Sequence, residues 1–518
     1  MASRCTNCGG ELIYDVAAGK VKCLFCSSMF EPDEFREKTA AEEIAPDELY
    51  ETTVFVCPNC GGQIEAEEQS AVDYCLYCGS FVTLESRLAQ VQKPKYIIPF
   101  LKTKEDCRDI YRSMIRKKIY APKEFRRAEY LEGFRGIYIP FWKYEYEYGP
   151  DVRLKGTETS RQGEYVIEQE YNISCSIEGT IANVSRDASS TFDDTIAAKI
   201  SPYEIHQMKE YSPSYMYGFY ADIADINADI YTEDVGKESE IEIWDHVVSN
   251  LPEEMRLRVT YKKPDSIEDT FHIREKHDLA MFPVWFLTWR KGNRVAYSVV
   301  NGENGNIYSE IPVSLPRYIL FSLLTAIPIF LILSLFTFEV GQMLITSCIA
   351  AVIILWLYNF QLARIVSRVN HEEDIGYRVK YNFYEDGTST GKSELSIIGV
   401  VLVIFVALAL FFSSGLFLLI GVEIAAVLLP IITLIKIASN SVKLKDPTVW
   451  LDCGFAVIAL IVGVIILILD PAADEIYYWA AVGCVAGVIL TTVGTMRRFD
   501  RLVTREVPHF FDSKGGDK

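Results

Sequence analysis

The chain beyond residue 316 contains six apolar runs of 18 to 20 residues that almost entirely lack charged side chains. A run of this length matches the hydrocarbon core of a bilayer, whereas the helices of a soluble domain usually keep one polar face. We therefore predict an all-α transmembrane domain of six helices at residues 317–497. The runs are Tyr318–Phe336, Met343–Phe360, Leu395–Phe412, Leu416–Ile435, Leu451–Leu469 and Ile476–Thr495.

The connectors between these runs alternate in their content of Lys and Arg. Thr337–Gln342, Ser413–Gly415 and Asp470–Glu475 contain none, whereas the other two connectors and the tail at 498–518 are basic. Cytoplasmic connectors carry the excess of Lys and Arg, so both termini are expected in the cytoplasm of a multi-pass cell-membrane protein. No apolar run precedes residue 316, and we expect no export of the segment before it.

Eight of the 13 cysteines lie in two units that repeat at an offset of 52 residues. Each unit has two Cys-x-x-Cys pairs, 14 residues apart, and begins with Cys-x-Asn-Cys-Gly-Gly. Two such pairs can enclose zinc in four thiolates, which leaves no position for a substrate. We predict zinc ribbons at residues 1–30 and 53–90, each with one structural Zn²⁺. The ligands are Cys5, Cys8, Cys23 and Cys26 in ribbon 1, and Cys57, Cys60, Cys75 and Cys78 in ribbon 2.

The two cages are separate in sequence, and the free energy of metal binding is also free energy of folding. Loss of one ligand, at Cys8 or at Cys60, is therefore expected to unfold only the ribbon that contains it.

Residues 91–316 are rich in Tyr, Trp, Ile and Val and are predicted to form a mixed α/β cytoplasmic domain. Thr103 and Asp106 have the spacing of a capping box at the start of an amphipathic helix. The other elements expected are strands at Ile137–Tyr146, Val166–Glu178 and Phe282–Trp289, a helix at Glu238–Asn250, and a hairpin at Val295–Ile311. The chain is thus multidomain, with two ribbons, an α/β domain and a membrane domain.

The balance of charge argues against nucleic acid as a partner of the ribbons. The chain has 51 Lys and Arg against 70 Asp and Glu, a formal net charge of −19. Residues 1–90 contain six basic and 16 acidic residues, and much of the acidic excess lies in a linker at 31–52. Binding to nucleic acid depends on neutralising phosphates with Lys and Arg. We therefore expect the ribbons to dock a protein or to stiffen the chain.

The segment Lys93–Lys143 reverses this balance, with 14 basic and six acidic residues. Its expected helix places Arg108, Arg112 and Arg116 on one stripe at four-residue spacing. Such a stripe is typical of a solvated helix face, but it would also suit anionic lipid headgroups or the protein's own acidic linker. The sequence leaves these three interpretations open.

Five short motifs accompany the paired ribbons within about residues 1 to 312. They are Lys95–Phe100, Gly136–Trp142, Tyr211–Phe219, Phe282–Trp285 and the Asn301-Gly302 turn. In this combination the chain resembles a family of bacterial double-zinc-ribbon membrane proteins, often labelled transcription-factor-type or primosomal-helicase-like. The resemblance implies a membrane partner in envelope-stress systems, working beside phage-shock-protein-A-like and stomatin/flotillin-like (SPFH) proteins.

No catalytic constellation is recognisable around the six histidines, so we predict no catalytic or cofactor-binding residues and no enzyme. The function predicted is that of an integral membrane adaptor or scaffold, which presents the ribbons and the α/β domain to cytoplasmic proteins. We expect contacts with membrane lipids, and the sequence leaves open whether the chain forms a homo-oligomer. One alternative is an ion or small-solute transporter or channel that uses Glu423, an acid well inside an apolar run. The other alternative is a zinc-ribbon protein that binds nucleic acid.

Overall fold

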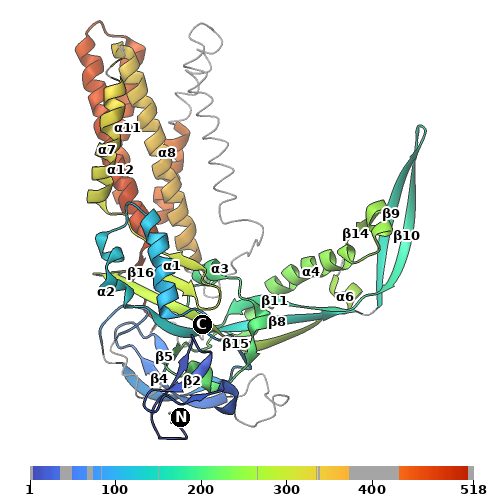
Figure 1. Cartoon of the computed structure of the whole chain (residues 1–518). Coiled ribbons are helices and arrows are strands. Elements are labelled where there is room, and N and C mark those ends of the chain that lie inside the picture. The colour runs from blue at the N-terminus through green and yellow to red at the C-terminus, as the bar shows by residue number, and fades with distance from the viewer. Residues whose placement is uncertain are drawn as a thin grey trace.

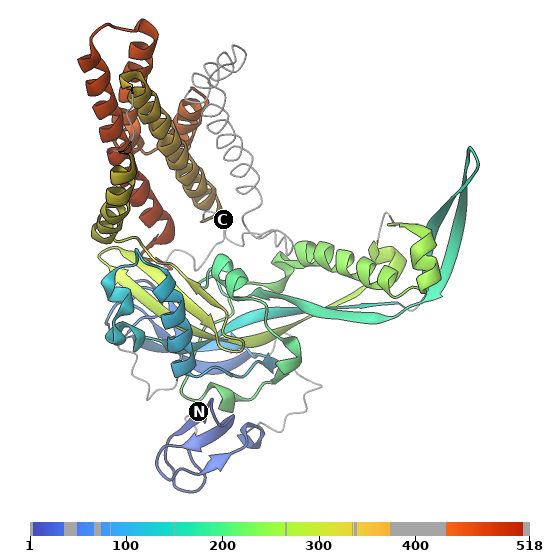
Figure 2. The ribbon, with the colours of Figure 1, turned by 45° about the horizontal axis from the view of Figure 1, so that its top comes forward.

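The computed structural model of the chain describes residues 4–35, 49–66, 74–82, 84–149, 151–264, 267–333, 335, 339–372 and 431–510. A soluble part, built around a large sheet, lies at one end of a group of long apolar helices (Figure 1). A narrow arm of two long strands extends from the sheet, and ribbon 1 lies on the side of the sheet away from the helices (Figure 2).

Ribbon 1 has a small antiparallel sheet of its own. Its strands follow the order β1-β2-β3, and its buried residues Leu12 and Val21 belong to the same apolar cluster as Tyr138 of the large sheet. Gly19 has a φ of +65°, which only glycine adopts without strain, and it closes the turn between the first two strands. The elements are β1 (Leu12–Asp15), β2 (Lys20–Cys23), β3 (Met29–Phe30) and η1 (Pro32–Phe35).

A sheet of twelve strands forms the rest of the soluble core. Its main path is β12-β7-β15-β8-β13-β5-β4-β6, with β11 paired to β8, and β16 paired to β15, β17 and β18. Three of these strands, β4, β5 and β6, belong to ribbon 2, so ribbon 2 is part of the large sheet. The strands are β4 (Leu49–Val56), β5 (Gln63–Glu65), β6 (Glu85–Gln92), β7 (Tyr96–Ile97), β8 (Arg135–Tyr148), β11 (Gly179–Asp187), β12 (Lys209–Glu210), β13 (Tyr220–Ala221), β15 (Arg274–Lys291), β16 (Arg294–Asn301), β17 (Ile307–Ser309) and β18 (Arg505–Glu506).

The centre of this sheet is the long antiparallel pair β8 and β15, in which Ile139 lies opposite Phe282. Successive side chains point to opposite faces, and both faces are covered. On one face Tyr138 packs with buried residues of α1 (Lys104–Lys117), which has the predicted capping box at Thr103. On the other face Ile139 packs with α3 (Asp194–Ile200) and with ribbon 2. The mixed α/β prediction is confirmed.

The arm consists of β9 and β10, which pair from Asp151 to Ser176 around a turn at Gly163. β14 pairs only with the middle of β9, from Lys155 to Glu158, and β10 is an edge strand with most of its residues exposed to solvent. Tyr165, Val166 and Ile167 are exposed near its tip. The elements around the arm are β9 (Asp151–Gln162), β10 (Tyr165–Ser176), α4 (Thr232–Ser249), α5 (Glu253–Arg258), β14 (Val259–Lys262) and α6 (Ile267–Phe271).

The described part of the membrane domain contains four long apolar helices, α7 (Leu315–Leu333), α8 (Val340–Glu372), α11 (Thr448–Leu469) and α12 (Asp474–Val503), and a further helical stretch at residues 431–444. Three helical segments of the described chain, 340–366, 448–469 and 474–503, are long and apolar enough to cross a membrane. The apolar segment of α7, Leu315–Pro328, is shorter than these three. The run at 395–412, most of the run at 416–435 and Glu423 lie outside the described residues. The count of six spans therefore stays a prediction.

Small residues bring the membrane helices together. Gly487 of α12 packs directly on Ala456 of α11, where a Cβ at position 487 would lie 2.7 Å from the Ala456 Cα. Such close approach of small residues is the usual basis of helix packing in lipid. The outer faces of α11 and α12 carry large exposed apolar side chains, among them Leu451 and Trp479, as lipid-facing helices do.

The chain after α12 returns to the soluble part. Arg505 of β18 pairs with Val295 of β16, and its guanidinium group forms ion pairs with Asp193 and with the buried carboxylate of Glu310. Farther on, the backbone N–H of Phe510 donates to a carbonyl oxygen of ribbon 2 at 2.6 Å. The end of the last helix therefore lies on the same side as the sheet.

Candidate metal centres

The four thiols of ribbon 1 meet between two tight turns. The Sγ atoms of Cys5 and Cys26 lie 3.6 Å apart and those of Cys8 and Cys23 lie 3.5 Å apart. All four sulfur atoms lie within 4.8 Å of one another. Zinc bound tetrahedrally at about 2.3 Å to sulfur separates its ligands by about 3.8 Å, so this donor set fits zinc.

Ribbon 2 repeats this geometry in a buried setting. The Sγ atoms of Cys57 and Cys78 lie 3.7 Å apart, as do those of Cys60 and Cys75, and all four cysteines are buried. The eight thiols thus form two separate four-cysteine groups in the pairing predicted from the sequence. With four protein ligands each, both groups suit a structural ion and leave no coordination site for a substrate.

A second repeated contact supports each cage. In ribbon 1 the amide of Asn7 donates to Ser28 Oγ at 3.0 Å, and in ribbon 2 Asn59 donates to Ser80 Oγ at 3.0 Å. The Ser28 hydroxyl also lies 3.1 Å from Cys26 Sγ. Together with the Ser28 backbone N–H and Cys8 it lowers the pKa of Cys26 to about 6, and the Ser28 hydroxyl makes the largest contribution. It thereby favours the thiolate that a metal requires. The repeated Cys-x-Asn-Cys-Gly-Gly motif includes both asparagines, but the sequence reasoning gave them no role and missed the two serines, which recur at the same offset as the cysteines.

The two ribbons differ in how their second Cys-x-x-Cys turn, here called the second knuckle, is covered. In ribbon 2, Leu76 and Tyr77 lie between the cysteines of this knuckle and are 1% and 2% exposed. The corresponding residues of ribbon 1, Leu24 and Phe25, are 55% and 84% exposed. The same apolar knuckle is thus buried in one ribbon and free in the other.

The second knuckle of ribbon 2 packs against β15 and β16, and we call this supporting surface its seat. The hydroxyl of Thr288 donates to the carbonyl of Leu76, and that of Tyr297 donates to the carbonyl of Tyr77 at 2.6 Å. Arg290 Nη1 donates to the carbonyl of the adjoining cysteine at 3.0 Å. These donors pair the backbone carbonyls of the knuckle, which would otherwise be buried without hydrogen bonds, while apolar packing covers its side chains.

Ribbon 1 is held to the body through a different surface. The backbone N–H of Tyr14 donates to the carbonyl of Tyr217 at 3.0 Å, and Ser214 Oγ donates to the carbonyl of Pro32 at 2.8 Å. These partners lie within Tyr211–Phe219, one of the five motifs singled out in the sequence. This motif is therefore the seat of ribbon 1.

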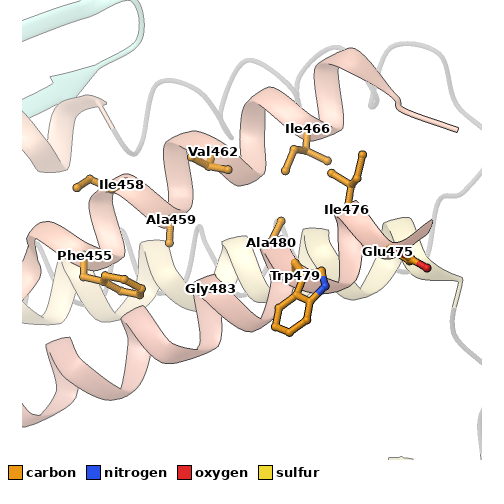
Figure 3. Close-up of a pocket in the computed structure, with 10 residues that line it drawn as sticks. All are labelled: Phe455, Ile458, Ala459, Val462, Ile466, Glu475, Ile476, Trp479, Ala480 and Gly483. Atoms are coloured by element: carbon orange, nitrogen blue, oxygen red, sulfur yellow. The ribbon is translucent and has the colours of Figure 1, made fainter. Parts of the chain in front are cut away.

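The other candidate groups offer less chemistry. Arg108 pairs with Glu132 and Arg112 with Asp109, so neighbouring acids neutralise part of the predicted basic stripe. A groove between α11 and α12 is lined almost entirely by apolar side chains, with Glu475 at its rim (Figure 3). Such a lining is typical of a lipid-facing surface and holds no constellation for catalysis.

Comparison with known proteins gives one distant relative. A protein of Bacillus subtilis (strain 168), described as uncharacterized protein YdjG, is 22% identical over 316 residues. The match covers 60% of this chain and 90% of the B. subtilis protein. No family model matches the chain, and no solved structure matches it.

Proposed function

We propose that the protein is a membrane adaptor in which zinc in ribbon 2 stabilises the soluble sheet, while ribbon 1 docks a cytoplasmic protein. The observation that carries this proposal is the exposed pair Leu24 and Phe25 on a knuckle whose counterpart in ribbon 2 is fully seated. Exposed apolar side chains held rigidly next to a structural metal are well suited to a protein interface.

The seat of ribbon 2 indicates what the partner of ribbon 1 should offer. It combines an apolar surface with hydroxyl and guanidinium donors, which reach the knuckle carbonyls. A protein surface can supply both features. A nucleic acid would instead meet the acidic surroundings of the ribbons, where residues 1–90 hold six basic and 16 acidic residues.

In the same proposal the apolar helices anchor the protein in the cell membrane with both termini in the cytoplasm. The return of β18 to the soluble sheet supports this topology, because a chain that begins and ends on one side crosses a membrane an even number of times. Six spans meet this condition, and the basic connectors favour the cytoplasm for the shared side.

We further propose that the partners are proteins of an envelope-stress system, such as phage-shock-protein-A-like or stomatin/flotillin-like proteins, and that the protein is not an enzyme. The five motifs of the sequence support this assignment, and several of them have a clear structural role. Tyr211–Phe219 seats ribbon 1, and Phe282–Trp285 lies at the centre of the sheet.

Replacing Leu24 and Phe25 with serine is expected to reduce co-purification of the partner at least tenfold, because apolar anchors dominate such interfaces. The full chain would be purified in mild detergent and its associated proteins quantified, together with its zinc content. Zinc should stay at two ions per chain, since neither side chain is a ligand.

Phe81→Ser provides the matched control, because this aromatic of ribbon 2 is 83% exposed and lies outside the knuckle. It should leave co-purification unchanged. Equal loss in the control, or a wild-type preparation that retains only nucleic acid in a salt-sensitive manner, would contradict the proposal.

A further inference from the structure

A short basic segment, residues 116–127, begins with the last two residues of α1 and contains the 3₁₀ helix η2 (Lys123–Arg126); we call it the basic loop. Two buried side chains, Ala121 and Phe125, fix it to the soluble core, and the Phe125 ring lies 5.2 Å from that of Trp289. Six basic side chains of the loop are exposed, namely Arg116, Lys117, Lys118, Lys123, Arg126 and Arg127. Their loop is thus held in place while the charges face outward.

The loop lies directly against the start of the first apolar helix, α7. The Tyr120 ring packs 5.4 Å from the ring of Tyr318 and 6.0 Å from that of Phe321. Two hydrogen bonds join the same segments, one from the N–H of Ser314 to the Tyr120 carbonyl at 2.8 Å. The other runs from Arg317 Nη1 to the carbonyl of Ala121 at 2.6 Å. The six bases therefore lie at the level where α7 becomes apolar.

These six bases far outnumber the one acid of the loop, Glu124. Within the described part of the chain none of the six forms an ion pair, in contrast to Arg108 and Arg112 lower on α1. Ile119, between the first three bases and Tyr120, is exposed as well. An exposed apolar side chain beside unpaired cations at this level suits the boundary between headgroups and acyl chains.

We propose that the basic loop 116–127 binds the phosphate groups of anionic phospholipids in the cytoplasmic leaflet. Each base near such a surface strengthens binding about fivefold, so several together select anionic over zwitterionic lipid. Bound lipid fixes the sheet, and with it ribbon 1, at a set position relative to the membrane. The proposal rests on the membrane insertion of the apolar helices proposed above, but not on docking by ribbon 1.

The test uses the full chain in nanodiscs that contain a photoactivatable phosphatidylglycerol or the matching phosphatidylcholine. Labelling of the peptide that spans the basic loop is measured by mass spectrometry. We expect at least tenfold more labelling by phosphatidylglycerol. The variant K117Q/K118Q/K123Q/R126Q/R127Q should lose this preference, whereas K117R/K118R/K123R should retain it.

The matched control is K20Q/K22Q, which removes two bases from ribbon 1 on the side of the sheet away from the helices (Figure 2). It should not alter labelling of the loop. Equal labelling by both lipids would overturn the proposal, as would a glutamine variant with two zinc ions that keeps the preference. The proposal would also be overturned if the glutamine variant lost a bound nucleic acid or acidic protein rather than its lipid preference. Failure of the chain to enter nanodiscs would refute the membrane anchor itself.

Discussion

Cys60→Ser is expected to unfold the whole sheet domain, whereas Cys8→Ser is expected to unfold ribbon 1 alone. Strands β4, β5 and β6 of ribbon 2 continue the twelve-stranded sheet, and the buried Cys60 belongs to the same core as Ile139 and Phe282. Structural zinc contributes about 10–16 kcal/mol to folding in small zinc domains, which matches or exceeds the stability of a whole domain. Cys5, Leu12 and Val21 of ribbon 1 pack in the same buried cluster as Tyr138, but no described strand of ribbon 1 pairs with the large sheet. We therefore expect the large sheet to keep its hydrogen bonds when ribbon 1 unfolds.

Zinc content, limited proteolysis and thermal unfolding of the full chain measure this asymmetry. Cys8→Ser should retain one zinc ion and a protease-resistant sheet domain, while Cys60→Ser should yield no resistant sheet domain. Cys175→Ser is the control, because this cysteine lies in the arm and belongs to neither metal group. A sheet domain that resists protease in Cys60→Ser would show that ribbon 2 folds independently.

Arg505→Met is expected to cost about 3–5 kcal/mol and to release the C-terminal segment from the sheet. The guanidinium group of Arg505 bonds Asp193 and Glu310, and the Glu310 side chain is buried. Without the arginine this buried carboxylate loses its ion pair with Arg505, although it still accepts the backbone N–H of Tyr297. Chemical unfolding and protease cleavage near Val507 report the two effects.

A second change in the same variant tests the cause. Adding Glu310→Gln to Arg505→Met should recover a large part of the lost stability, because it removes the buried charge that has lost its ion pair with Arg505 while preserving the side-chain shape. Arg501→Met serves as a comparison, since this arginine is exposed and pairs with Asp446 near the surface. It should cost less than about 1 kcal/mol. Equal costs at 501 and 505 would contradict the anchoring role of Arg505.

The metal groups could be predicted because four cysteines at fixed spacing have few other uses. The burial of one knuckle and the exposure of the other could not be predicted, because Cys23-Leu-Phe-Cys26 and Cys75-Leu-Tyr-Cys78 look alike in sequence. What separates them is a seat on β15 and β16, some 210 residues away along the chain. For the same reason the sequence suggests two independent ribbons, while the structure joins ribbon 2 to the sheet.

Local signals predicted the elements with strong periodicity. The capping box at Thr103 begins α1 as expected, and the Asn301 turn joins β16 to β17. The strand predicted at Val166–Glu178 forms as β10, whereas its position in an exposed arm and the returning strand β18 escaped prediction for different reasons. β10 shows strand alternation but nothing marks its exposure, and the two-residue β18 has no periodicity at all.

The central claim is that ribbon 1 is the docking element and ribbon 2 the structural one. It is tested most directly by a photocrosslinking phenylalanine analogue placed at position 25, 77 or 81 in living cells. Position 25 should form a light-dependent adduct with another protein, and Leu24→Ser should weaken it. Position 77 should react only within the chain, with β15 or β16, and the exposed position 81 should give no specific adduct. A position 25 without an adduct, or with the same adducts as position 81, would contradict the claim.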